Sequence, residues 1–155
     1  MREIEQIKGI VDSWETSLLA SEKKYIHYRS MTNFIFHYNN LPDSRIKEKV
    51  AAILSGYIDE VQNNQFDYKG KKSFDLASKY MDKLSEIYKP CLGFKSIIDF
   101  RFIIIFSILG DGLLYLVLKN KIQFYFPVIS LCLITYYLHA KFFFEKKKML
   151  YGIYY

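Results

Sequence analysis

The chain has few of the residues that cross-link or interrupt small proteins: its 155 residues include two cysteines, three prolines and one tryptophan. Cys91 and Cys132 lie far apart, so we expect neither a disulfide framework nor a zinc site built from paired cysteines. Glycine-rich phosphate loops, nucleophile elbows and paired-carboxylate motifs are also lacking. We therefore predict a protein that is not an enzyme and that holds no cofactor or metal.

The N-terminus lacks the apolar core of a secretory signal peptide, because residues 1–5 are mostly charged. We therefore expect the amino-terminal part to stay in the cytosol. The abundance of Lys, Ile, Asn, Tyr and Phe is typical of an AT-rich, bacterial genome.

Long apolar runs, by contrast, are present. Residues 102–118 and 122–140 form two of them, joined by a short turn that contains Lys119 and Lys121. The first run contains a single charged side chain, Asp111. Each run is about as long as the roughly 17–25 residues that a helix needs to cross a bilayer. The sequence predicts a two-helix transmembrane hairpin over residues 96–145.

A water-soluble alternative places residues 110–112, Gly-Asp-Gly, in a loop that divides the first run into two short buried helices. A chain this small has too little other apolar surface to cover both runs on every side. The membrane interpretation is therefore favoured.

Basic residues are more numerous at the outer ends of the two runs than in the turn between them, which favours two cytoplasmic termini. The outer ones are Lys89, Lys95, Arg101, Lys141, Lys146, Lys147 and Lys148. We expect a multi-pass protein of the bacterial inner membrane, with residues 146–155 as a basic and aromatic tail on its inner surface. Most of the net charge of +6 then flanks the lipid bilayer, and we expect no nucleic-acid partner.

The remaining residues, 1–95, predict a cytosolic three-helix domain, so the fold class is all-α: a small helical bundle followed by the hairpin. Residues 2–38 have the pattern of one long amphipathic helix, followed by helices over 44–63 and 73–89, the last ended by Pro90. The first helix carries a heptad-like apolar seam, which predicts packing within the bundle, against a second copy or against a protein partner. The seam residues are Ile4, Ile7, Val11, Trp14 and Leu18.

Asp111 is the sharpest candidate for a functional residue, since a charge at the bilayer centre costs at least about 2.5–3.5 kcal/mol. Antiparallel pairing of the two runs predicts the Ser130 hydroxyl as its partner, with Thr135 a turn further along. Gly110 and Gly112 predict close packing with another helix. Two interpretations stay open: a pore-lining or proton-responsive group in an oligomer, or a protonated carboxyl that fixes the hairpin.

His139 lies near the cytosolic end of the second run and is the remaining polar pore candidate. Two spans with cytosolic helices resemble, in plan, the small two-span effectors of bacterial defence systems. Our leading hypothesis is a self-associating membrane effector that acts by permeabilisation or signalling, as in defence or toxin systems. The alternative is a binding protein without pore activity, such as an immunity factor or an assembly subunit of a membrane complex.

Overall fold

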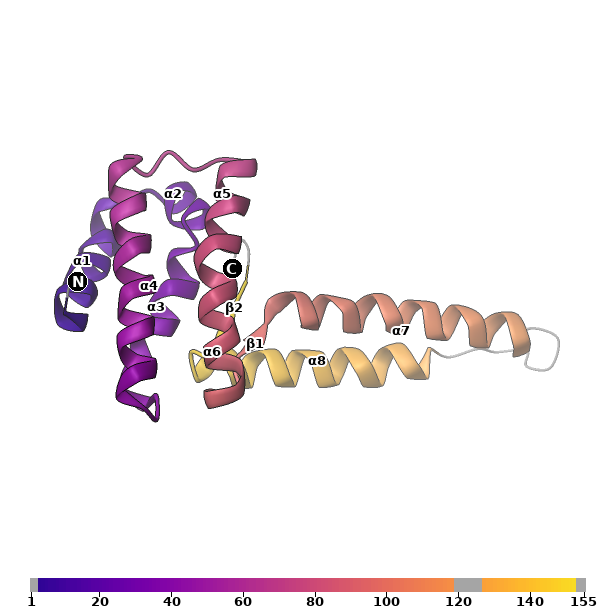
Figure 1. Ribbon diagram of the computed structural model, residues 1–155. Helices are drawn as coiled ribbons and strands as arrows, with labels where there is room; N and C mark the ends of the chain where they lie inside the picture. Colours follow the sequence, from indigo (N-terminus) through magenta and orange to yellow (C-terminus); the bar gives the residue numbers. More distant parts are fainter. Residues whose placement is uncertain (1–2, 119–126, 153–155) are drawn as a thin grey trace.

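The computed structural model describes residues 3–118 and 127–152, and these are mostly helical, with short connecting turns and one pair of two-residue strands. A bundle of helices fills one end of the molecule, and two long helices, α7 and α8, project from it side by side (Figure 1). The predicted all-α class is confirmed.

The N-terminal region is divided into three helices, so the prediction of one long helix over 2–38 is wrong. They are α1 (Ile4–Ser17), α2 (Ala20–Tyr25) and α3 (Tyr28–Phe36). Leu18 and Leu19 are extended, with the Glu22 carboxylate accepting the amide of Leu19 at 2.7 Å. His27 takes a left-handed conformation with φ of 58°. These two breaks fold the chain back, and α1 packs on α3 and on the next long helix, α4.

Helix α4 runs from Ser44 to Asn63, after a short 3₁₀ turn at Tyr38–Asn40, and Asp43 caps it by accepting the amide of Arg45 at 2.9 Å. A second long helical stretch comprises α5 (Lys71–Leu76), a π-helical turn η2 (Ala77–Met81) and α6 (Asp82–Leu92).

Pro90 does not stop this stretch, contrary to the sequence prediction. A proline removes one backbone donor, but here it lies in the last turn of α6. The stretch ends instead at Gly93, whose φ of 75° is accessible to glycine and whose amide bonds the Lys89 carbonyl at 2.9 Å.

The predicted apolar seam lies in the core of the bundle. Ile7, Val11 and Trp14 are buried, and Ile4 and Leu18 pack against the core while remaining partly exposed. The Trp14 ring meets Tyr57 edge-on at 6.2 Å. The seam is therefore packed within the chain, as the sequence predicts for one of its possible partners.

The hairpin consists of α7 (Ile97–Leu118) and α8 (Val128–Lys146). Helix α7 contains the first predicted apolar run, 102–118, whereas the start of the second run, at residue 122, lies outside the described residues. Of the helices in the described ranges, α7 alone is long and apolar enough to cross a membrane, and 11% of its most apolar window is buried.

Residues 150–152, within the interfacial tail predicted over 146–155, are buried in the bundle, whereas residues 146–148 are exposed. Strand β2 (Leu150–Tyr151) pairs in parallel with β1 (Lys95–Ser96), and both its residues are buried. Helix α8 returns the chain to α3, where Asn33 Nδ2 donates to the Leu150 carbonyl at 2.7 Å. Protein groups, rather than lipid, thus cover this segment. The last three residues lie outside the described ranges.

Gly152 has no room for a side chain, because a Cβ there would lie 2.3 Å from Ile97 Cγ2. Ile97 is buried and β-branched, so it cannot turn away easily. We expect Gly152→Ala to lower the free energy of unfolding by about 1–3 kcal/mol, the usual cost of overpacking. Gly9→Ala is the matched control: its site on α1 is open, and alanine should stabilise the helix by up to about 1 kcal/mol. Chemical denaturation measures both, and equal stability of the two variants would contradict the tight junction.

Candidate functional site

The Asp111 carboxylate lies on the face of α7 that meets α8, and the residue is only 6% exposed. Its Oδ2 accepts the backbone amide of Ser130 at 2.6 Å. Helix α8 begins at Val128 after Pro127, so the Ser130 amide belongs to the first turn, which has no acceptor within its own helix. Asp111 therefore caps a neighbouring helix, at the end whose dipole favours an acceptor oxygen.

The sequence predicts the Ser130 hydroxyl as the partner of Asp111, and the contact described in the structure is with the backbone amide of the same residue. The other pore candidates do not converge with Asp111. The Thr135 hydroxyl donates to the Leu131 carbonyl within α8 at 2.8 Å, and both Thr135 and His139 are exposed. The four polar residues thus do not form one site within the chain.

The two glycines beside Asp111 differ in their surroundings. Gly110 is half-buried, whereas no atom lies within 4 Å of a Cβ placed on Gly112. Gly112 therefore does not serve the packing of α7 on α8. Ser107, one turn before Asp111, is the small residue that is fully buried in α7.

The outer surface of α7 is apolar and exposed on more than one side. Its most exposed large side chains are Phe102, Ile105, Phe106, Ile108, Leu109, Leu113, Tyr115, Leu116 and Val117. Exposed apolar side chains gathered on one helix are typical of a contact with another apolar phase or with a partner.

The base of the hairpin is fastened to α3 by polar contacts. Arg29 pairs with Glu145 of α8 at 2.5 Å, and a ring nitrogen of His37 lies 2.8 Å from the Lys147 carbonyl. Ser30 Oγ donates to the Gly152 carbonyl at 3.2 Å and accepts its amide at 3.1 Å. One face of α3 thus binds the backbone that follows α8, and this fixes the hairpin relative to the bundle.

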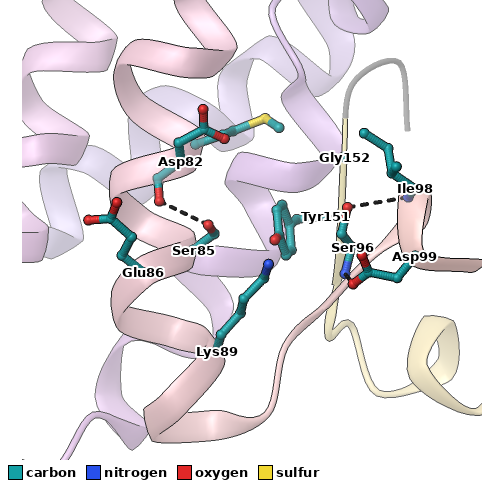
Figure 2. A pocket seen from close by; sticks show the side chains of 10 residues that line it. Asp82, Ser85, Glu86, Lys89, Ser96, Ile98, Asp99, Tyr151 and Gly152 are labelled. Carbon is teal, nitrogen blue, oxygen red and sulfur yellow. Dashed lines mark hydrogen bonds between the residues drawn. The ribbon is translucent and has the colours of Figure 1, made fainter.

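A cavity of about 450 Å³ lies at this base, between α6, the first turn of α7 and β2 (Figure 2). Lys89 extends towards Tyr151, with Nζ 5.5 Å from the ring centre. A hydrogen bond with the Tyr151 side chain raises the pKa of Lys89, which keeps the ammonium charged. Across the cavity, Ser96 Oγ accepts the Ile98 amide at 3.2 Å, and Asp99 accepts the Ser96 amide at 3.3 Å, a capping box that begins α7.

Sequence reasoning missed a buried contact between His27 and Ser73, which lie 46 positions apart. His27 Nε2 is 2.8 Å from the Ser73 carbonyl, and since a carbonyl only accepts, this nitrogen carries the proton. The Ser73 hydroxyl donates to the Tyr25 carbonyl at 2.6 Å. The hydroxyl proton thus points away from the imidazole, and the pair is not arranged as a nucleophile and base.

No protein-family model, curated protein or solved structure matches this chain. Within residues 3–118 and 127–152, no group of three His, Cys, Asp or Glu side chains is placed to hold a metal ion. What the arrangement offers is a folded helical domain joined firmly to a long apolar hairpin.

The cap on α8 is tested by replacing Asp111. Asp111→Asn keeps an acceptor oxygen for the Ser130 amide and should cost little. Asp111→Leu leaves that amide unpaired in apolar surroundings, which should cost about 1–3 kcal/mol. Thr135→Val is the control, because the exposed hydroxyl bonds only its own helix in the contacts described. Thermal unfolding in detergent compares the variants, and an Asp111→Leu protein as stable as Thr135→Val would rule out the cap.

The burial of His27 predicts a loss of stability in acid. Burial lowers its pKa below the ordinary value, and the hydrogen bond to Ser73 opposes this only in part. The unfolded chain therefore takes up a proton first, as pH falls through about 6.5. Stability should be fully present above that pH and should decrease until the lowered pKa of the folded state is reached.

His27→Asn should remove this part of the pH dependence, since asparagine tolerates the left-handed backbone of this position. Urea unfolding between pH 7.5 and about 5 measures both proteins, and the difference between their slopes isolates His27. Parallel slopes would show that the imidazole is not held neutral by burial.

Proposed function

We propose that the protein is a membrane-anchored binding protein, of the immunity-factor or assembly-subunit kind. In this proposal α7 and α8 cross the bacterial inner membrane, both termini are cytoplasmic, and the bundle of α1–α6 presents a protein-binding surface to the cytosol. The observation that carries the proposal is the exposed apolar surface of α7.

Helix α7 has the length and surroundings of a spanning helix. Its 22 residues extend about 33 Å, against a hydrocarbon core of about 30 Å. A core helix of a water-soluble protein buries its apolar side chains, but only 11% of the most apolar window of α7 is buried. Leu113 is 66% exposed and Val117 is 71% exposed. A bilayer supplies the apolar environment that the rest of the chain does not.

The support for a second membrane-spanning helix, α8, is weaker than that for α7. It has no charged residue from Val128 to Leu138, and its lysines gather towards the end at Lys146, beside the bundle. That end lies next to the start of α7, so the basic residues of both helices fall on one side, as the cytoplasmic side of an inner-membrane protein requires.

We propose that the protein forms no pore, because the polar groups described in the hairpin bond to its own helices. Asp111 is turned towards α8 and caps it, and Thr135 bonds within its own helix. A carboxylate used in this way needs no water-filled path to satisfy it. The firm attachment of α3 to the segment after α8 would then hold a bound partner in a fixed orientation over the membrane.

A self-associating effector that permeabilises the membrane is the second candidate, and Gly112 favours it. The open space over Gly112 would allow a helix of a second copy to approach the α7 backbone closely. In that arrangement the homo-oligomer forms through the hairpins rather than through the seam on α1.

Charge placed on the exposed surface of α7 tests the membrane proposal. The double variant Leu109→Arg, Leu113→Arg disturbs no buried contact, so a water-exposed hairpin should tolerate it. In a bilayer each charge costs at least about 2.5–3.5 kcal/mol, and we expect the membrane-bound fraction to fall strongly. Leu19→Arg with Phe74→Arg is the matched control, because these side chains are similarly exposed on the bundle.

Flotation with liposomes measures the bound fraction. A parent protein that stays in the aqueous fraction, or an α7 variant that floats like the control, would contradict the anchor. Dye release separates the two candidates: an anchor releases no dye, whereas an effector should release it and should lose this activity in Gly112→Leu.

A further inference from the structure

The cavity of Figure 2 lies where α7 leaves the bundle, and Ile98 and Asp99 of the first turn of α7 form part of its wall. If α7 enters the bilayer here, the mouth of the cavity is level with the lipid headgroups. Its volume of about 450 Å³ falls within the range of small-molecule sites, roughly 300–1,000 Å³.

The charges of this cavity are mixed. One face of α6 contributes Asp82, Glu86 and Lys89, which are spaced four and three residues apart, and α7 contributes Asp99. Three carboxylates against one ammonium disfavour an anionic ligand. A zwitterion fits better, with its cation near the carboxylates and its anion near Lys89, whose raised pKa keeps it charged.

An apolar track continues from the same cavity along α7. Ile98 lines the cavity, and Phe102, Ile105 and Leu109 follow it at intervals of four, three and four residues, which places all four on one face of the helix. All four are exposed. A polar cavity that opens onto an apolar strip matches an amphiphile, with a headgroup in the cavity and an acyl chain on the strip.

We propose that this cavity and the track from Ile98 to Leu109 bind one phospholipid with an ethanolamine headgroup. The primary ammonium donates to the α6 carboxylates, those of Asp82 and Glu86, and the phosphate lies near Lys89. A choline headgroup has no N–H to donate, and a glycerol headgroup carries no positive charge. The site rests on the proposed membrane anchor, because only insertion of α7 brings lipid to it.

Lipid binding to the full-length protein tests this site. Delipidated protein in detergent is titrated with phosphatidylethanolamine, phosphatidylcholine or phosphatidylglycerol, and bound lipid is counted by native mass spectrometry. We expect phosphatidylethanolamine to bind about tenfold more tightly than the other two, the factor that one charge-assisted hydrogen bond supplies. Equal binding of ethanolamine and choline lipids, or a preference for the glycerol lipid, would overturn the proposal.

Two variants locate the site. Glu86→Gln and Lys89→Gln should each remove most of the preference, and Glu48→Gln, on an exposed part of α4 outside the cavity, should keep it. Retention of the full preference in both cavity variants would overturn the assignment. Glycerophosphoethanolamine, which lacks acyl chains, should bind at least tenfold more weakly than the lipid. Equal binding would assign the cavity to a soluble headgroup and overturn the lipid.

Flotation distinguishes failure of this site from failure of the anchor. Protein that floats with phosphatidylcholine liposomes but shows no ethanolamine preference contradicts the headgroup site alone. Protein that floats with no liposome, whether of phosphatidylcholine or of phosphatidylcholine with phosphatidylethanolamine, contradicts both proposals.

Discussion

The arrangement of the molecule depends on the hydrogen bonds by which α3 holds the chain after α8. Asn33 and Ser30 are buried, and they satisfy the backbone of Leu150 and Gly152 where no long sheet is available to do so. Unpaired, each of those buried backbone groups would cost about 1–3 kcal/mol. The same contacts bring Tyr151 into the core beside Phe34, so the C-terminal segment completes the bundle.

In the hairpin, too, one hydrogen bond satisfies buried polar groups of two segments. Its first helix contains a carboxylate that an apolar environment penalises, and its second begins with amides that lack acceptors. Placing Asp111 against the first turn of α8 satisfies both needs with one contact. The outer surface can then remain almost wholly apolar, which is the condition for burial in lipid.

Sequence patterns predicted the long elements well, since α4 and α7 each contain enough turns for periodicity or composition to specify them. They failed where tertiary contacts decide the local structure. His27, at the break between α2 and α3, contacts Ser73, 46 positions away. The spacing of the apolar residues over 2–38 continues across this break, so it does not indicate that the helix ends there. The C-terminal residues have the same aromatic and apolar character whether lipid or protein covers them, so only the partner strand β1 distinguishes the two.

The candidate site residues differ in the same way in how far the sequence predicts them. Asp111 was found because a lone carboxylate in an apolar run is unusual, but its acceptor role towards a backbone amide depends on where α8 begins. The cavity at the start of α7 is lined by residues of α6, α7 and β2. Because these elements are far apart in the sequence, no local sequence pattern predicts it. Since β2 both lines that cavity and is held by α3, a ligand bound there would contact the junction between hairpin and bundle directly. Tyr151 and Gly152 therefore belong both to the wall of the cavity and to the contact that joins the hairpin to the bundle.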